Sequence, residues 1–274
     1  PPGGALADGP VSFDGDPYAR SRPMGTLIQA LRDLGVRIDD GDRAAFPFLV
    51  EGTGTVPGGL VELDATASSQ FISALLLAGS RYERGVEVRH VGGPIPSQPH
   101  IDMTVEFVRT AGGAVDDSEP GRWLVTPSAL RGRPWVIEPD LSNAAPFLAA
   151  ALVTGGTVTV ADWPHSTTQA GDALRGLLRE MGARVELTKA GLTVSGGAGV
   201  HGLEVDLHDV GELTPTLAAI AALADSPSRF TGIGHLRGHE TDRLAALARE
   251  INGLGGDVTE EPDGLVIRPR ALHG

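Results

Sequence analysis

Near the end of the chain, the stretch LRGHETDRL at 236–244 places a histidine, two carboxylic acids and an arginine within five positions. These are His239, Glu240, Asp242 and Arg243. Such residue types suit proton transfer and the binding of an anionic group. An amphipathic helix is predicted to follow, and the positions expected to face the core are Leu244, Leu247, Ile251 and Leu254. The first turn of this helix is then free to carry chemistry, and Asp242 is expected to support the turn rather than the chemistry.

Bulk composition excludes several functional classes. The 274 residues are 41% hydrophobic, yet no apolar run approaches the roughly 20 residues that span a membrane, and no signal-type segment opens the chain. We therefore expect a soluble, cytoplasmic protein without a membrane partner. The absence of Cys excludes disulfides, thiolate metal sites and a Cys nucleophile. A net charge of -13 argues against binding to nucleic acid.

Lysine is almost missing. Of 22 basic residues only Lys189 is a lysine, so any bound phosphate must be held by hydroxyls, backbone N–H groups or arginines. We expect no metal and no cofactor.

An internal repeat organises the chain. A helical pattern ends at Gly35, Gly112, Gly182 and Gly255, which lie 77, 70 and 73 residues apart, and two short strands follow each time. A strand and a loop precede each of these helices. A further strand and helix are predicted at 59–79, 135–156 and 202–225. The repeating unit is therefore strand, helix, strand, helix, strand, strand, which defines an α/β fold.

The chain begins partway through a unit, because the second helix of the unit occurs four times and the first only three times. We expect a truncated protein, with one partial and one full unit in a first domain, 1–133. Two units are expected in a second domain, 134–274. A degenerate capping repeat at the start is the alternative.

Polar loops stand before the predicted helices. Those that follow the first strand of a unit are ATASSQ, DLSNAAP and DVGELTP, and those that follow the second are GDPYARSRP, GGPIPSQPH, WPHSTTQ and LRGHETDR. In strand-then-helix units these loops share one end of the sheet, and helix N-termini present free N–H groups to phosphate or carboxylate. We expect the loops to converge on a cleft between two α/β bodies.

The stretches DPYARSRP, ASSQF, PSQPHID and HETDRL together resemble the 5-enolpyruvylshikimate-3-phosphate synthase family, in the family's order. The resemblance implies an inverted α/β barrel of two domains, without a cofactor. It implies transfer of the enolpyruvyl group of phosphoenolpyruvate to shikimate 3-phosphate, by a protein that is monomeric when complete. The family's N-terminal Lys, Ser and Arg and its C-terminal Arg and Lys are not in this sequence. We therefore expect this chain alone to be inactive.

The resemblance assigns binding residues. Ser68, Ser69, Gln70 and Ser97 match positions that bind shikimate 3-phosphate, and Gln70 also matches a contact to phosphoenolpyruvate. Taken alone, Ser68 is interpreted as an ordinary helix N-cap. Arg22 and Arg243 match arginines that hold phosphoenolpyruvate; without the resemblance they are surface arginines.

It also assigns the acid–base pair. Glu212 matches a carboxylate, commonly Asp, near the 5-hydroxyl of shikimate 3-phosphate, and is expected to bind there and act as the general base. Glu240 is the expected proton donor to the methylene carbon of phosphoenolpyruvate. The alternative interpretation is an ordinary glutamate in the first turn of a helix, where the helix dipole favours a negative charge. His235 and His239 stand where the family more often has Asn and Lys, and are expected to contact shikimate 3-phosphate.

Two other functions stay open. UDP-N-acetylglucosamine enolpyruvyl transferase has the same repeat, but usually places a Cys acid on a mobile loop, and this chain has no Cys. A repeat-built module that binds without catalysis is the other alternative.

Overall fold

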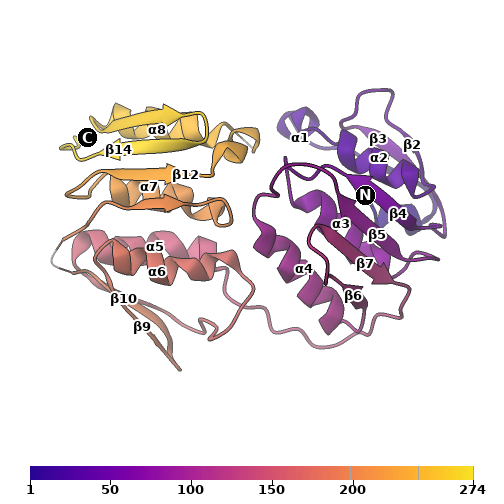
Figure 1. Cartoon of the computed structure of the whole chain (residues 1–274), viewed down its shortest axis with the longest axis horizontal. Helices are drawn as coiled ribbons and strands as arrows, with labels where there is room; N and C mark the ends of the chain where they lie inside the picture. Colours follow the sequence, from indigo (N-terminus) through magenta and orange to yellow (C-terminus); the bar gives the residue numbers. More distant parts are fainter. Residues whose placement is uncertain (198, 240, 274) are drawn as a thin grey trace. The chain divides into compact units, whose positions relative to one another are not determined.

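The computed structural model describes residues 1–197, 199–239 and 241–273. Contacts divide these residues into two compact units, the first ending at Pro134 and the second beginning at Trp135 (Figure 1). The described strands form four open sheets, and they do not close into a barrel. Each unit has its own hydrophobic core. No helix in the described ranges is long and apolar enough to cross a membrane.

The chain opens with the partial repeat. Its elements are η1 (Gly4–Leu6), β1 (Asp8–Phe13), α1 (Pro17–Ser21), α2 (Gly25–Asp33), β2 (Arg37–Asp39) and β3 (Phe48–Thr53). The sheet order is β1-β3-β2, and both pairings are antiparallel.

A full repeat completes the first unit. Its elements are β4 (Gly59–Leu63), α3 (Gln70–Gly79), β5 (Val86–His90), α4 (Gln98–Thr110), β6 (Ala114–Asp116) and β7 (Arg122–Thr126). The order is β4-β5-β7-β6, with β4 and β5 parallel and the other pairs antiparallel. The hydroxyl of Thr104 donates to the hydroxyl of Ser73 at 2.9 Å, so α4 and α3 are tied side by side and start at the same end of the sheet.

The last repeat has the same plan. Its elements are β11 (Glu204–Asp206), η3 (Gly211–Leu213), α7 (Thr214–Ala221), β12 (Ser228–Thr231), η4 (Gly234–Gly238), α8 (Arg243–Gly253), β13 (Asp257–Glu261) and β14 (Gly264–Arg268). The order β11-β12-β14-β13, with only β11 and β12 parallel, reproduces that of the earlier full repeat. Figure 1 shows α7 and α8 alongside their strands. The predicted α/β repeat is confirmed.

The third repeat differs from prediction. Its elements are α5 (Leu141–Thr154), β8 (Thr157–Val160), η2 (Ala170–Ala173), α6 (Leu174–Glu180), β9 (Arg184–Thr188) and β10 (Gly191–Ser195). The sheet order is β8-β10-β9, so within the described residues the strand predicted at the start of 135–156 is not formed, and that prediction was wrong.

Side chains rather than a β-ladder hold this segment. Pro134 and Pro139 flank it and have no N–H to donate. The Gln169 amide donates to the carbonyl of Pro139 at 3.0 Å and to the carboxylate of Glu138 at 2.8 Å. Val136 is left 95% exposed. This segment therefore has the apolar composition of a strand but does not pair with a neighbouring strand.

Glycine ends each second helix of a repeat as predicted. Gly35, Gly112, Gly182 and Gly255 have φ values of 92, 93, 105 and 86°. The next residue's N–H returns to the helix each time, as Val36 N–H does to the carbonyl of Leu31 at 3.0 Å. This bond satisfies a carbonyl that the helix itself leaves unpaired, and the left-handed turn it needs costs glycine little.

The apolar face of α8 is buried as expected, with one exception. Leu244 and Ile251 are buried, and Leu247 packs against the same core. Leu254 lies just beyond the end of the helix and is exposed, so its predicted core position was wrong. The helical period does not continue into the turn at Gly255.

Candidate active site

The predicted serine motif lies at the N-terminus of α3. Ser69 is buried and stands at the N-cap position, while its side chain makes no capping bond within the described residues. The hydroxyl of Ser68 accepts from the N–H of Gln70 at 3.2 Å, and Gln70 is exposed. The helix boundary puts the N-cap at Ser69, but the hydroxyl of Ser68 makes the bond expected of a capping residue, so the capping role of Ser68 remains compatible with the structure. Hydroxyls and helix N–H groups therefore gather where a phosphate can bind.

Ser97 occupies the equivalent position before α4. It is buried, and its φ of 55° is a left-handed backbone that few residues other than glycine adopt. Its loop contacts the serine loop directly, because the N–H of Gly93 donates to the hydroxyl of Thr66 at 3.1 Å. The predicted shikimate 3-phosphate residues of the first unit thus lie on two connected loops.

Arg22 follows α1 in the partial repeat. Asp16 caps this short helix by accepting from the N–H of Ala19 at 2.9 Å. The guanidinium of Arg20 hydrogen-bonds Asp14 and lowers the pKa of that carboxyl to about 2. Arg22 itself is exposed, and its side chain has no hydrogen bond or ion pair with the described residues. Hydrogen bonds of Asp14 and Asp16 therefore hold the loop, while the Arg22 side chain has no partner among the described residues.

Glu212 and Arg243 meet in the second unit. Glu212 lies in η3, Arg243 begins α8, and the guanidinium Nη1 is 3.0 Å from the carboxylate Oε2. Both side chains are partly exposed, at 34% and 23%. The proposed base and one proposed anion-binding arginine thus form an ion pair that solvent can still reach.

Three imidazoles cluster beside that pair. The ring centroid of His235 is 5.9 Å from those of His208 and His239. Burial lowers the pKa of His235, and the two neighbouring histidines lower it further, because a second positive charge nearby is unfavourable. Its Nε2 atom is buried against Gly211 without a partner among the described residues. The structure therefore favours a neutral His235.

Sequence reasoning missed His208. It lies between β11 and η3, in the loop that also leads to Glu212, and it is half-buried. The available signal was its position directly before the predicted polar loop DVGELTP, at the end of a predicted strand. Its edge-to-face contact with His235 depends on two loops meeting, which a linear pattern does not show.

Glu240, the predicted proton donor, lies outside the described residues. Its neighbour Asp242 supports the turn as expected, accepting from the N–H of Ala245 at 3.0 Å as the N-cap of α8. Burial alone would raise the pKa of Asp242, but that N–H and the guanidinium of Arg237 lower it overall. The stretch LRGHETDRL is therefore anchored by its aspartate.

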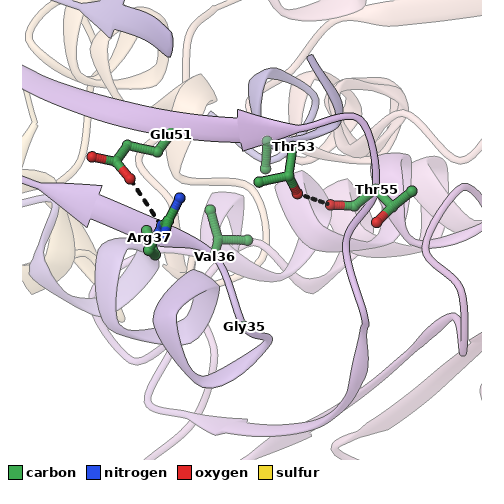
Figure 2. Close-up of a pocket in the computed structure, with 7 residues that line it drawn as sticks. Gly35, Val36, Arg37, Glu51, Thr53 and Thr55 are labelled. Carbon is green, nitrogen blue, oxygen red and sulfur yellow. Dashed lines mark hydrogen bonds and ion pairs between the residues drawn. The ribbon is translucent and has the colours of Figure 1, made fainter. Parts of the chain in front are cut away.

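A pocket of about 250 Å³ lies elsewhere, on the partial repeat (Figure 2). Its lining residues are Ala5, Gly35, Val36, Arg37, Glu51, Thr53 and Thr55. None is a predicted site residue, and its Arg37–Glu51 ion pair at 2.8 Å is largely exposed. In the described ranges no three His, Asp or Glu side chains are grouped to hold a metal ion. Lys189 sits in the turn between β9 and β10.

The predicted residues thus form two sets, each described within its own unit. Arg22, the serine motif and Ser97 belong to the first unit, whereas Glu212, the histidines and Arg243 belong to the second. Convergence of the two sets on one cleft stays a prediction.

Comparison with solved structures defines the class of fold. An EPSP synthase from Acinetobacter baumannii superposes with a TM-score of 0.76 over 98% of this chain and 61% of that one, at 24% identity. The enolpyruvyl transferase NikO from Streptomyces tendae gives a TM-score of 0.67 over 97% and 61%, at 16% identity. The chain therefore has the enolpyruvyl transferase fold.

Comparison of sequences assigns the chain to a narrower group of proteins than the fold does. The profile of EPSP synthase (3-phosphoshikimate 1-carboxyvinyltransferase) matches residues 3–274. A 3-phosphoshikimate 1-carboxyvinyltransferase of Kocuria rhizophila is 54% identical over 100% of this chain and 62% of its own length. The chain belongs to the EPSP synthase family, and it spans about three fifths of the length of these relatives.

Proposed function

We propose that the protein to which this chain belongs transfers the enolpyruvyl group of phosphoenolpyruvate to the 5-hydroxyl of shikimate 3-phosphate. In this reaction the hydroxyl oxygen bonds to the carbon that carries the phosphate, and inorganic phosphate leaves. The product belongs to the route to chorismate and the aromatic amino acids. We place the reaction in the cytoplasm, with a monomeric protein and no cofactor.

The contact between Glu212 and Arg243 carries this proposal. A hydroxyl that attacks phosphoenolpyruvate needs a base on one side and a cation that holds the anionic partner on the other. The two side chains come from different loops, and their 3.0 Å separation brings both functions to one place. The family match across residues 3–274 supports the choice of substrates.

The loops of the first unit are proposed to supply the remaining substrate contacts. Ser68, Ser69 and Ser97 offer hydroxyls at two helix starts, and these can hold the phosphate of shikimate 3-phosphate without lysine. Gln70 is exposed at the same place and is proposed to contact both substrates. Arg22 is proposed to hold phosphoenolpyruvate together with Arg243.

Protons must move at two sites. Glu212 is proposed to take the proton of the 5-hydroxyl, and Glu240 is proposed to deliver a proton to the methylene carbon of phosphoenolpyruvate. The methylene carbon thereby becomes a methyl group. The double bond is restored when a proton leaves this carbon and phosphate leaves the neighbouring one. His235 and His239 are proposed to contact shikimate 3-phosphate. A neutral imidazole at His235 can form a hydrogen bond with a ring hydroxyl of shikimate 3-phosphate without adding charge.

Calorimetry with the purified chain tests binding. We expect shikimate 3-phosphate to bind, and shikimate without phosphate to bind more weakly. UDP-N-acetylglucosamine is the control for the other enolpyruvyl transferase, and preferential binding of that nucleotide would replace the proposal.

Turnover is tested in a chimera with a related protein. In a chimera, residues 1–274 replace the matching segment of the Kocuria rhizophila relative, and phosphate release is measured with both substrates. We expect the chimera to turn over and the isolated chain to release no measurable phosphate, because losing one preorganised donor costs roughly 10²- to 10³-fold and the site loops here contain no lysine. A chimera that binds without turnover would support a non-catalytic module.

A further inference from the structure

His90 is the last residue of β5 and has no role in the reaction as proposed above. Both ring nitrogens are engaged: the N–H of Ala65 donates to Nδ1 at 3.2 Å, and Nε2 lies 2.7 Å from the carbonyl oxygen of Gly93. A carbonyl only accepts, so Nε2 carries the hydrogen and Nδ1 is the acceptor. The geometry thus defines a neutral ring in one tautomer.

The two partners of this ring belong to different loops. Ala65 stands at the start of the serine loop, 65–70, and Gly93 stands in the loop 91–97, which ends at Ser97. The backbone carbonyl of Ala65 accepts from the N–H of Ser68 at 3.0 Å. The position of Ala65 therefore sets where the serine motif lies, and the ring connects that position to the second loop.

The backbone of His90 is held at the end of β5, an inner strand of its sheet. The N–H of His90 donates to the carbonyl of Gly121 at 2.8 Å, and the parallel ladder pairs His90 with Leu63 on β4. A strand-anchored side chain is better suited to fix two loops than either loop is to fix itself. The hydrogen bond from Gly93 N–H to Thr66 adds a second connection.

We propose that His90 is a positioning residue that holds the two phosphate-binding loops of the first unit together, and that it does so only as the neutral Nε2–H imidazole. The assignment of the bound ligand rests on the proposed function; the coupling of the loops does not.

Protonation removes one of the two connections. A proton on Nδ1 faces the N–H of Ala65, so that bond breaks while the bond to Gly93 remains. The carboxylate of Asp64, in the loop after β4, lies close enough to His90 for the two groups to interact electrostatically. On the β7 side the guanidinium of Arg122 is engaged by Glu87 and Asp116. Anion affinity is therefore expected to fall as His90 takes up a proton.

Nuclear magnetic resonance of the chain tests the coupling without any ligand. Long-range ¹H–¹⁵N spectra give the tautomer of His90 and its titration midpoint. We expect the Nε2–H form, and amide shifts of Ala65, Ser68 and Gly93 that follow the same midpoint. A Nδ1–H tautomer, or amides that do not follow His90, would overturn the proposal.

Two substitutions separate positioning from packing. His90→Gln keeps an acceptor and a donor but does not titrate, whereas His90→Phe keeps the ring volume and loses both bonds. Sulfate is the probe, because it stays a dianion from pH 5.5 to 8, and shikimate 3-phosphate is the second ligand. His201→Gln is the matched control, since His201 lies in the second unit and pairs with Asp225.

We expect His90→Phe to weaken binding about 3- to 10-fold for each hydrogen bond lost. His90→Gln should bind as the parent does when His90 is neutral, and it should not share the parent's extra weakening at pH values below the midpoint measured for His90. Equal affinity and equal pH dependence in parent, Phe and Gln variants would refute the proposal. If the parent binds neither probe, the proposed function loses its support, and the amide titrations still decide the role of His90.

Discussion

The guanidinium of Arg243 lies 3.0 Å from the carboxylate of Glu212, across 31 positions of sequence. A base that is paired with an arginine is held in one orientation and kept partly neutralised. An anion that binds Arg243 competes for that guanidinium and loosens its hold on Glu212. Anion binding and activation of the base are therefore expected to be linked.

Replacing the proposed base tests this relationship. Glu212→Gln keeps the shape and removes the basicity, so phosphate release by the chimera should fall by about 10²- to 10⁴-fold while shikimate 3-phosphate still binds. Calorimetry and a phosphate assay give the two quantities. Near-normal turnover would show that the base lies elsewhere.

The arginines are expected to act on phosphoenolpyruvate. Arg22→Ala or Arg243→Ala should each weaken its apparent affinity in the chimera by about 10- to 100-fold, the loss of a charge-assisted contact worth roughly 1.5 to 3 kcal/mol. Arg249→Ala is the control on the same helix as Arg243, since that side chain is 74% exposed. Unchanged steady-state kinetics in both test variants would remove these residues from the site.

His235 makes stability depend on pH. Its pKa is lowered by burial and by His239 and His208, so the folded chain binds fewer protons there than the unfolded chain. Stability should therefore fall as the pH drops from the ordinary value of 6.5 toward the lowered pKa. In calorimetric melting curves His235→Asn should flatten this decline and His201→Asn should leave it in place. An identical slope in His235→Asn would contradict the assignment.

Glycine at the end of α6 is expected to be required. Gly182 has a φ of 105°, and an added Cβ would lie 2.6 Å from the carbonyl oxygen of Gly199. Gly182→Ala should lower the free energy of unfolding by about 1 to 2 kcal/mol or more. Gly176, inside the same helix, has open space around it, and Gly176→Ala should add about 0.5 to 1 kcal/mol. Urea denaturation of both variants measures the difference, and equal effects would contradict it.

Local sequence predicted much of the fold because its signals act over a few residues. A helix must stop where glycine adopts a left-handed turn, so Gly35, Gly112, Gly182 and Gly255 located four helix ends. Asp242 was predicted to support a turn, because a short carboxylate can cap the N–H groups that follow it. The same local signals also predicted that polar loops stand directly before the helix starts.

Composition failed where pairing decides the outcome. The segment after Pro134 is apolar enough for a strand, but a strand needs a neighbour, and Gln169 binds its end instead. Leu254 fits the period of α8, yet the helix ends before it. Period and composition describe one segment, whereas burial depends on the segments that meet it.

The sequence by itself determined the repeat, the glycine stops, the family and the residue types at the loops. Only the tertiary structure brought Glu212 to Arg243, His208 to His235, and Ala65 to His90. Each of these contacts joins loops that are distant in sequence. These contacts exist because strand pairing brings the loops at the strand ends together. Strand pairing is set by hydrogen bonds between strands, so the spacing of residues along the sequence does not show which loops will meet.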